Sequence, residues 1–206
     1  MTFRFCDDRG NQGFSWLAVE PQTRTSHALA ADGRVWLVDP VDWDVALGRA
    51  LSLGQPAAVL QLLDRHNRDS AALAARVGVP HLTVPASVPE SPFRVIELIR
   101  RRFWQEVALW WPEAQTLVVS ESIGTNPFFA NGADSAGVHL ALRLWPPRAA
   151  LEAFVPKHLL VGHGEGLHGP DAAEGLRHAL ADARTGLPRA LLGLPGLLLR
   201  ARRQGD

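Results

Sequence analysis

The stretch Ala57–Pro80, AAVLQLLDRHNRDSAALAARVGVP, places a strand pattern, a polar loop and a helix pattern in immediate succession. It begins with the apolar run AAVLQLL, whose length and composition are typical of a strand buried in a sheet. It ends with SAALAARVG, a helical pattern closed by Gly78 and Pro80. The residues between them, Asp64–Asp69, are all polar. Because ligands bind at the carboxyl ends of strands in open α/β sheets, we expect a functional site at this loop.

The segments on either side predict a layered α/β domain with its helices outside. We expect strands at 14–18, 26–31, 34–39, 81–84, 93–99, 106–111, 116–120 and 158–161, and helices at 45–53, 70–78 and 170–184. Asp32-Gly33 is a strong signal for a two-residue hairpin turn. Residues 124–137 are loop-rich, residues 151–154 end a short helix, and no regular structure is assigned to 200–206. We expect one domain over 1–206, with a core of about 14–184 and a C-terminal tail at 187–206.

Composition excludes several classes of function. The 206 residues contain 21 Lys plus Arg and 21 Asp plus Glu, so the formal net charge gives no general attraction to nucleic acid or to an anionic membrane. The single cysteine, Cys6, excludes an intrachain disulfide. No segment approaches the roughly 20 apolar residues of a membrane span, and the first residues lack a signal-peptide core. We therefore expect a cytoplasmic protein whose partner is a small-molecule substrate or anion. The sequence is also compatible with a homo-oligomer.

Several motifs, in order, resemble those of the metallo-β-lactamase superfamily. A hairpin ends in Leu-Val-Asp-Pro at residues 37–40, and the polar loop Asp64–Asp69 stands where that family has H-x-H-x-D-H. Glu121 then closes a buried strand, and Gly162-His163-Gly164 follows the last one. The resemblance covers roughly residues 14–184. It implies a four-layer αββα sandwich and a hydrolase in which divalent metals activate water.

The chain departs from the family pattern at most metal-binding positions. The first histidine of the loop is Asp64, its aspartate is Arg68 and its last histidine is Asp69, whereas the second histidine is kept as His66. The bridging aspartate corresponds to Glu121, and the final histidine is kept as His163. The mid-chain histidine is missing from residues 99–105.

These departures leave two hypotheses. In the first, one divalent metal (zinc, iron or manganese) is held by some of five residues: Asp64, His66, Asp69, Glu121 and His163. In the second no metal is bound, and the guanidinium of Arg68 replaces its charge among Asp64, Asp69 and Glu121. The first predicts a hydrolase of unknown substrate that attacks an ester, thioester, lactone, amide or phosphoester. The second predicts a pseudoenzyme that binds a small anion or a protein.

Other polar residues near these motifs have two interpretations each. Asp39 either orients a ligand or forms a turn, and His168 either lines the mouth of the site or belongs to a loop before a helix. Asp69 also suits the N-cap of the helix that follows it. The run Arg100–Arg102 is either a solvated face or, if it borders the site, a receptor for a phosphate or carboxylate. A third, structural role in assembly would use the Leu- and Arg-rich segment 187–203. No catalytic residue is assigned.

Overall fold

The computed structural model describes residues 1–66, 68–130 and 135–204. The strands are β1 (Phe3–Cys6), β2 (Gly13–Ala18), β3 (Thr25–Ala31), β4 (Arg34–Val38), β5 (Gln55–Gln61), β6 (His81–Thr83), β7 (Arg94–Arg101), β8 (Trp104–Trp111), β9 (Thr116–Val119), β10 (Ile123–Gly124), β11 (Gly137–Val138), β12 (His158–Val161) and β13 (Leu167–His168). The helices are α1 (Asp44–Leu53), α2 (Ser70–Val77), α3 (Pro127–Ala130), α4 (Arg148–Leu151), α5 (Pro170–Asp182) and α6 (Leu187–Gln204), with 3-10 turns at Gly10–Gln12 and Leu140–Leu142.

The first sheet contains β1 to β6 in sequence order. Its first four strands form an antiparallel meander, and β4, β5 and β6 then run parallel. The β3–β4 hairpin turns at Asp32 and Gly33, whose φ angles of 49° and 74° are those of the two-residue turn that this pair predicts. The strand, loop and helix expected over residues 57–80 are confirmed as β5, its polar loop and α2.

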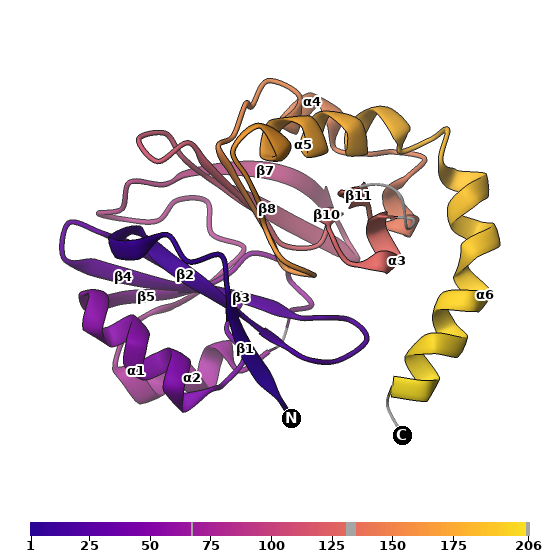
Figure 1. Ribbon diagram of the computed structural model, residues 1–206. Helices are drawn as coiled ribbons and strands as arrows, with labels where there is room; N and C mark the ends of the chain where they lie inside the picture. The colour runs from indigo at the N-terminus through magenta and orange to yellow at the C-terminus, as the bar shows by residue number, and fades with distance from the viewer. Residues whose placement is uncertain (67, 131–134, 205–206) are drawn as a thin grey trace.

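The second sheet has the order β13-β12-β9-β8-β7. Strands β9 and β12 are parallel, and the other neighbours are antiparallel. The two sheets face each other across the middle of the molecule (Figure 1). Because β4, β5, β9 and β12 all end at this same region, the residues that follow them are brought together.

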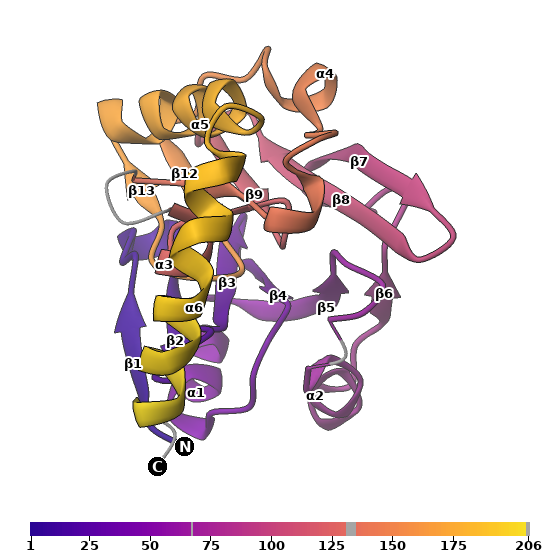
Figure 2. The ribbon, with the colours of Figure 1, turned by 90° about the vertical axis from the view of Figure 1, so that its right-hand side faces the viewer.

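Three buried clusters explain how the elements are held. The cluster between the sheets includes Trp36 of β4, Leu60 of β5 and Leu109 of β8. A second cluster packs α5 against the outer face of the second sheet, and a third packs the alanine-rich faces of α1 and α2 against the first sheet. The views in Figures 1 and 2 agree that these helices lie on the outer faces of the two sheets.

Several elements differ from the expectation. Strands β7 and β8 are longer than predicted and meet at a turn of Arg102 and Phe103, so the arginine run forms the end of a hairpin. Strand β1 adds an edge to the first sheet before residue 14. The segment expected as a C-terminal tail, with no regular structure assigned from residue 200 on, forms the helix α6, which extends through Gln204 beside α3 (Figure 2). Part of the loop-rich prediction, residues 131–134, and part of the tail, 205–206, lie outside the described residues.

No helix in the described part of the chain combines the length and apolar character that a bilayer crossing requires.

Candidate metal centre

The ends of three strands and the loop after a fourth bring four side chains into one place. Asp39 directly follows β4, His66 lies in the loop after β5, Glu121 follows the end of β9, and His163 follows β12. The first two therefore come from the first sheet and the last two from the second. The rings of His66 and His163 are 5.6 Å apart between centroids, although 97 positions separate them in the sequence. The one-metal hypothesis requires these two histidines to lie close together, and they do.

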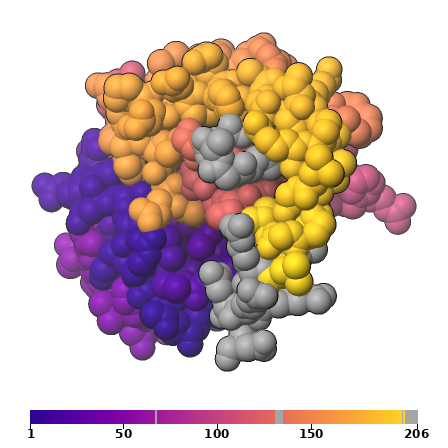
Figure 3. Space-filling model, turned by 45° about the vertical axis from the view of Figure 1, so that its right-hand side comes forward, coloured from indigo at the N-terminus to yellow at the C-terminus, as the bar shows by residue number. Residues whose placement is uncertain are grey.

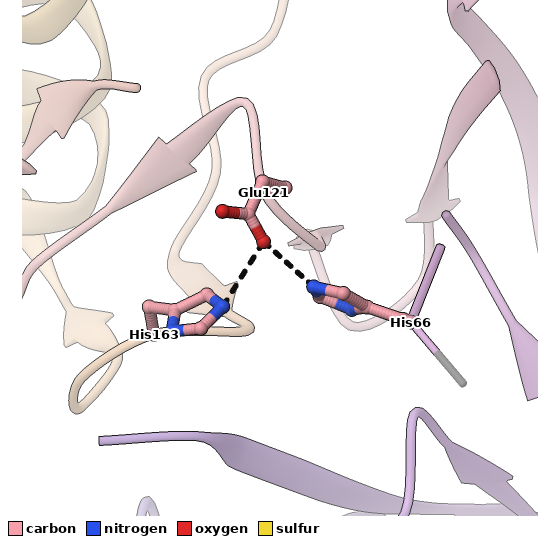
Figure 4. A group of neighbouring side chains, drawn as sticks. All are labelled: His66, Glu121 and His163. Atoms are coloured by element: carbon pink, nitrogen blue, oxygen red, sulfur yellow. Dashed lines mark hydrogen bonds and ion pairs between the residues drawn. The ribbon is translucent and has the colours of Figure 1, made fainter. Parts of the chain in front are cut away.

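Glu121 lies between the two histidines (Figure 4). Its Oε2 atom is 2.6 Å from His66 Nε2 and 3.0 Å from His163 Nε2. Burial by itself would raise the pKa of Glu121, but the hydrogen bonds and charges of His163 and His66 outweigh it and hold that pKa far below its usual range. Glu121 is therefore ionised at neutral pH.

Asp39 orients the ring of His66 from the side away from Glu121. His66 Nδ1 is 3.2 Å from Asp39 Oδ2 and 2.8 Å from Ser120 Oγ, and the Ser120 hydroxyl donates to the same carboxylate. Burial and the charge of Arg68 oppose protonation of His66, but the carboxylates of Asp39 and Glu121 outweigh them and raise its pKa. Without a metal, a second proton on this ring is therefore favoured.

The position of His163 is fixed by the backbone carbonyl of Gln22 and by the glycines on either side of it. Its Nδ1 atom donates to the main-chain oxygen of Gln22 at 2.8 Å, which leaves Nε2, facing Glu121, as the nitrogen that would bind a metal. The glycines on both sides are required by close backbone contacts. A Cβ at Gly162 would lie 2.2 Å from the carbonyl oxygen of Ser120. At Gly164, with φ of 102°, a Cβ would lie 2.2 Å from Thr125 Oγ1.

The donor set suits a single divalent metal. One ligand atom from each of His66, Glu121 and His163 can be chosen so that all three lie within 4.8 Å of one another. Two imidazoles and one carboxylate are a known ligand set for zinc centres that keep a further position for water. The outer nitrogen of each imidazole has a hydrogen-bond partner, Asp39 or the Gln22 carbonyl, as metal-bound histidines require. The residues present therefore fit the metal that the fold implies.

Arg68 occupies a different position from the one hypothesised. Its guanidinium donates to three backbone carbonyls, those of Thr25, Asp39 and Gly162, and these are its hydrogen bonds among the described residues. It makes no hydrogen bond to the carboxylates of Asp64, Asp69 or Glu121 in this part of the chain, and its buried Nε has no hydrogen-bond partner among the described residues. Burial lowers the pKa of Arg68, and the nearby charges of Asp39 and Glu121 oppose this effect.

Three other predicted site residues lie outside this group. The carboxylate of Asp64 is 3.7 Å from Arg65 Nε. Asp69 is the N-cap residue of α2, but its side chain accepts the N–H of Asp42 instead of capping the helix. His168 lies on β13, where it contacts Asp7 at 3.1 Å and His158 at 2.9 Å.

Sequence reasoning missed two residues that complete the centre. Glu106, fully buried on β8, accepts the backbone N–H groups of Glu121 and Ser122 and so fixes the turn that carries Glu121. His139 lies 3.5 Å from Glu121, between Nε2 and Oε1. Its Nδ1 atom accepts the N–H of Ala141, so Nε2 carries the ring proton. The sequence gives no signal for His139 because it follows a loop-rich segment without a recognisable motif.

The centre opens into a cavity of about 720 Å³, which we call the central cavity. Apolar side chains form much of its wall, including Trp104, Phe128, Phe129, Leu140 and Leu194 of α6. Trp104 lies in the 99–105 segment, where the family resemblance implied a histidine. Its indole N–H donates to Glu106 at 2.9 Å. The position therefore supplies a wall of the cavity in place of a metal ligand.

Comparisons with known proteins agree with this geometry at the level of the fold. A structure of the DIM-1 metallo-β-lactamase exposed to ceftazidime superposes with a TM-score of 0.59 at 11% identity, covering 88% of this chain and 97% of that one. A second DIM-1 structure gives a TM-score of 0.55 at 12% identity, covering 88% and 98%. The fold is that of the metallo-β-lactamases. No protein-family model and no curated protein matches the sequence. At this identity the metallo-β-lactamase likeness establishes the fold and leaves the chemistry to be argued from the site.

Proposed function

We propose that this chain is a hydrolase of the metallo-β-lactamase fold with a reduced site that holds one divalent metal through His66, Glu121 and His163. The observation that carries the proposal is the convergence of two imidazole nitrogens and one carboxylate oxygen at the wall of the central cavity. The two facing sheets with helices outside them suit a single four-layer αββα domain over the chain. The fold likeness to metallo-β-lactamases supports the same reading.

The residues of the centre would have different roles in binding the metal. A divalent ion at this position lowers the pKa of water toward about 7, which supplies a nucleophile at neutral pH. His66 and His163 would hold the ion through their Nε2 atoms, and Asp39 would keep the Nδ1 proton of His66 in place. Glu121 would supply the negative charge, and Glu106 would fix the backbone that carries it.

His139 would act on the substrate. Its tautomer is set by the backbone N–H of Ala141, so it presents an N–H to the central cavity next to Glu121. Burial lowers the pKa of His139, which keeps the ring neutral near pH 7. A neutral donor at this point would hydrogen-bond the oxygen of a scissile ester, thioester, lactone, amide or phosphoester, where negative charge develops.

A metal-free binding protein is the second candidate. The raised pKa of His66 favours it. Because Asp39 and Glu121 raise the pKa of His66, a proton between His66 and Glu121 satisfies the centre without an ion. Arg68 makes no hydrogen bond to the described carboxylates of the centre. In the metal-free hypothesis, the charge that replaces the metal is therefore the proton on His66 and not the guanidinium of Arg68.

Elemental analysis separates the two candidates. We expect protein purified without chelator, or reconstituted with zinc, iron or manganese, to retain about one equivalent of metal. His163→Ala should lose it, because two ligands remain. His178→Ala, at an exposed histidine of α5, is the matched control and should bind metal as the native chain does. A native protein that retains no metal after reconstitution with each of the three ions would reject the hydrolase proposal and favour the metal-free protein.

A further inference from the structure

A second cavity of about 940 Å³ lies beside the metal centre. It is bounded on one side by the β7–β8 hairpin and on the other by the segment 141–147. It shares two wall residues with the central cavity, Arg65 and Trp104. A ligand that extends past these two side chains would therefore occupy both cavities. In Figure 3 the end of the hairpin projects beyond the rest of the molecule.

The second cavity is positively charged. Arg65, Arg100 and Arg101 line it together with one carboxylate, Glu97, and the Asp64 carboxylate lies 3.7 Å from Arg65 Nε. Glu97 is 2.9 Å from Arg100, but both side chains are exposed and the pair is screened by water. Arg65 is fixed in place: its guanidinium lies 4.4 Å from the centre of the Trp104 ring and donates to the carbonyl of Phe103. The lining therefore carries an excess of positive charge, which suits an anionic group.

Two large aromatic side chains in the same lining are left in contact with water. Phe103 at the hairpin turn is 75% exposed, and Trp145 is 68% exposed. Of the fifteen phenylalanine and tryptophan residues, all of which the structure describes, these two are the exposed ones. Exposed aromatic rings next to arginine side chains form a surface on which a flat ring can stack, with cation–π contacts added.

We propose that the second cavity binds the nucleotide end of an extended substrate, a nucleoside phosphate whose base stacks on Phe103 or Trp145 and whose phosphates face Arg100 and Arg101. The proposal rests on the proposed function for the other end of the substrate, where the scissile bond lies in the central cavity. The volume matches a ligand of this size, since small-molecule sites span about 300–1,000 Å³. The zero net charge and the single bounded cavity favour one nucleotide over a polymeric strand.

Calorimetric titration of the full chain with ADP tests the proposal. We expect ADP to bind, pyrophosphate and adenosine alone to bind more weakly, and coenzyme A to bind more tightly than ADP if the nucleotide is carried on an acyl carrier. Arg101→Ala and Trp145→Ala should each weaken ADP binding by about three- to fivefold. Both side chains are exposed, so these variants should keep the native melting temperature.

Matched controls come from exposed residues elsewhere on the surface. Arg177→Ala on α5 and Val155→Ala should bind ADP as the native chain does. The titrations are repeated in EDTA, where binding should persist, so that a failure of the metal hypothesis is distinguishable from a failure of this one. Absence of ADP binding at millimolar concentration, or equal affinities in the variants and the native chain, would overturn the proposal. So would affinity for an oligonucleotide that rises with length while ADP does not bind.

Discussion

Asp39 is the residue on which the orientation of His66 depends. Its carboxylate contacts His66 Nδ1, accepts the Ser120 hydroxyl and accepts the backbone N–H of Leu62. Its backbone has a φ of 44°, which aspartate and asparagine adopt more readily than other side chains. Burial opposes ionisation of Asp39, but the charges of His66 and Arg68 lower its pKa below the usual value. Asp39 thus stays an acceptor and keeps the proton of His66 on Nδ1.

We therefore expect Asp39→Asn to weaken metal binding by about 10- to 100-fold. Asparagine keeps the backbone conformation, but its amide N–H faces His66 Nδ1 and moves the ring proton to Nε2, the nitrogen that should hold the metal. Competition with a chromophoric zinc chelator gives the affinity. Asp32→Asn is the control, because Asp32 also has a positive φ, 49°, and is exposed in the β3–β4 turn. An unchanged affinity in Asp39→Asn would show that this carboxylate does not position the ligand.

The sequence could locate the three central residues and Asp39, but not Glu106 or His139. His66, Glu121 and His163 follow buried strands, and strand ends are visible in an apolar pattern. Asp64 and Asp69 looked equivalent to His66 in sequence, but side-chain direction within a loop is set by contacts. Asp64 faces Arg65, and Asp69 accepts a distant N–H. In the sequence, Glu106 looks like any polar residue in a strand, because only the structure shows the turn that its carboxylate holds.

At the scale of elements, α6 shows why a helix was missed. Leu187, Ala190, Leu194 and Leu197 recur at helical spacing, and these positions are the less exposed ones in the structure. Gly193, Pro195 and Gly196 interrupt the pattern, because glycine and proline disfavour a helix interior. Contact with α3 compensates for that low propensity, and a single sequence does not show this contact. The resulting helix places Leu194 at the wall of the central cavity.

Arg68 connects elements of the two sheets. The three carbonyls that it binds belong to the start of β3, the residue after β4 and the residue after β12. Each carbonyl is turned toward the buried guanidinium and away from water. A buried side chain that donates to three backbone acceptors in this way links these strand ends, and β3 and β12 are also joined by the hydrogen bond from the Thr25 N–H to the Gly162 carbonyl.

Replacing Arg68 with Ala should lower the free energy of unfolding by roughly 2–5 kcal/mol, because buried acceptors lose their donor. Urea unfolding followed by tryptophan fluorescence measures it. We expect Arg68→Lys to recover little of the loss, since an ammonium group lacks the planar fork that reaches separate carbonyls. The control is Arg177→Ala on the exposed face of α5. If Arg68→Lys were as stable as the native chain, a charge interaction with the carboxylates would explain Arg68 better than the carbonyl contacts.

At the scale of the whole molecule, His27 is a buried titratable residue on β3 that several charged groups influence. The carboxylates of Asp7 and Asp39 favour its protonation, and the charges of Arg9 and Arg68 oppose it. His27 Nδ1 is 2.8 Å from Ser15 Oγ, and Nε2 is buried without a hydrogen-bond partner among the described residues. Burial lowers the pKa of His27 to about 4. The folded protein therefore favours the neutral ring over the charged one.

The protein should therefore lose stability as the pH falls from about 6.5 to 4. Over this range the unfolded chain binds a proton at His27 that the folded chain does not, so the free energy of unfolding decreases, by about 3 kcal/mol in total. The His27→Gln variant has no titrating ring at this position. Its free energy of unfolding should therefore depend less on pH between 4.5 and 7.5, measured by urea unfolding in EDTA.

Other groups also titrate. Asp39 and Glu121, with lowered pKa values, lose their contribution to stability at lower pH, and His66, with a raised pKa, acts in the opposite sense. Because both proteins contain these groups, the difference between the profiles isolates His27, and parallel profiles would show that the buried ring is not what destabilises the fold in acid.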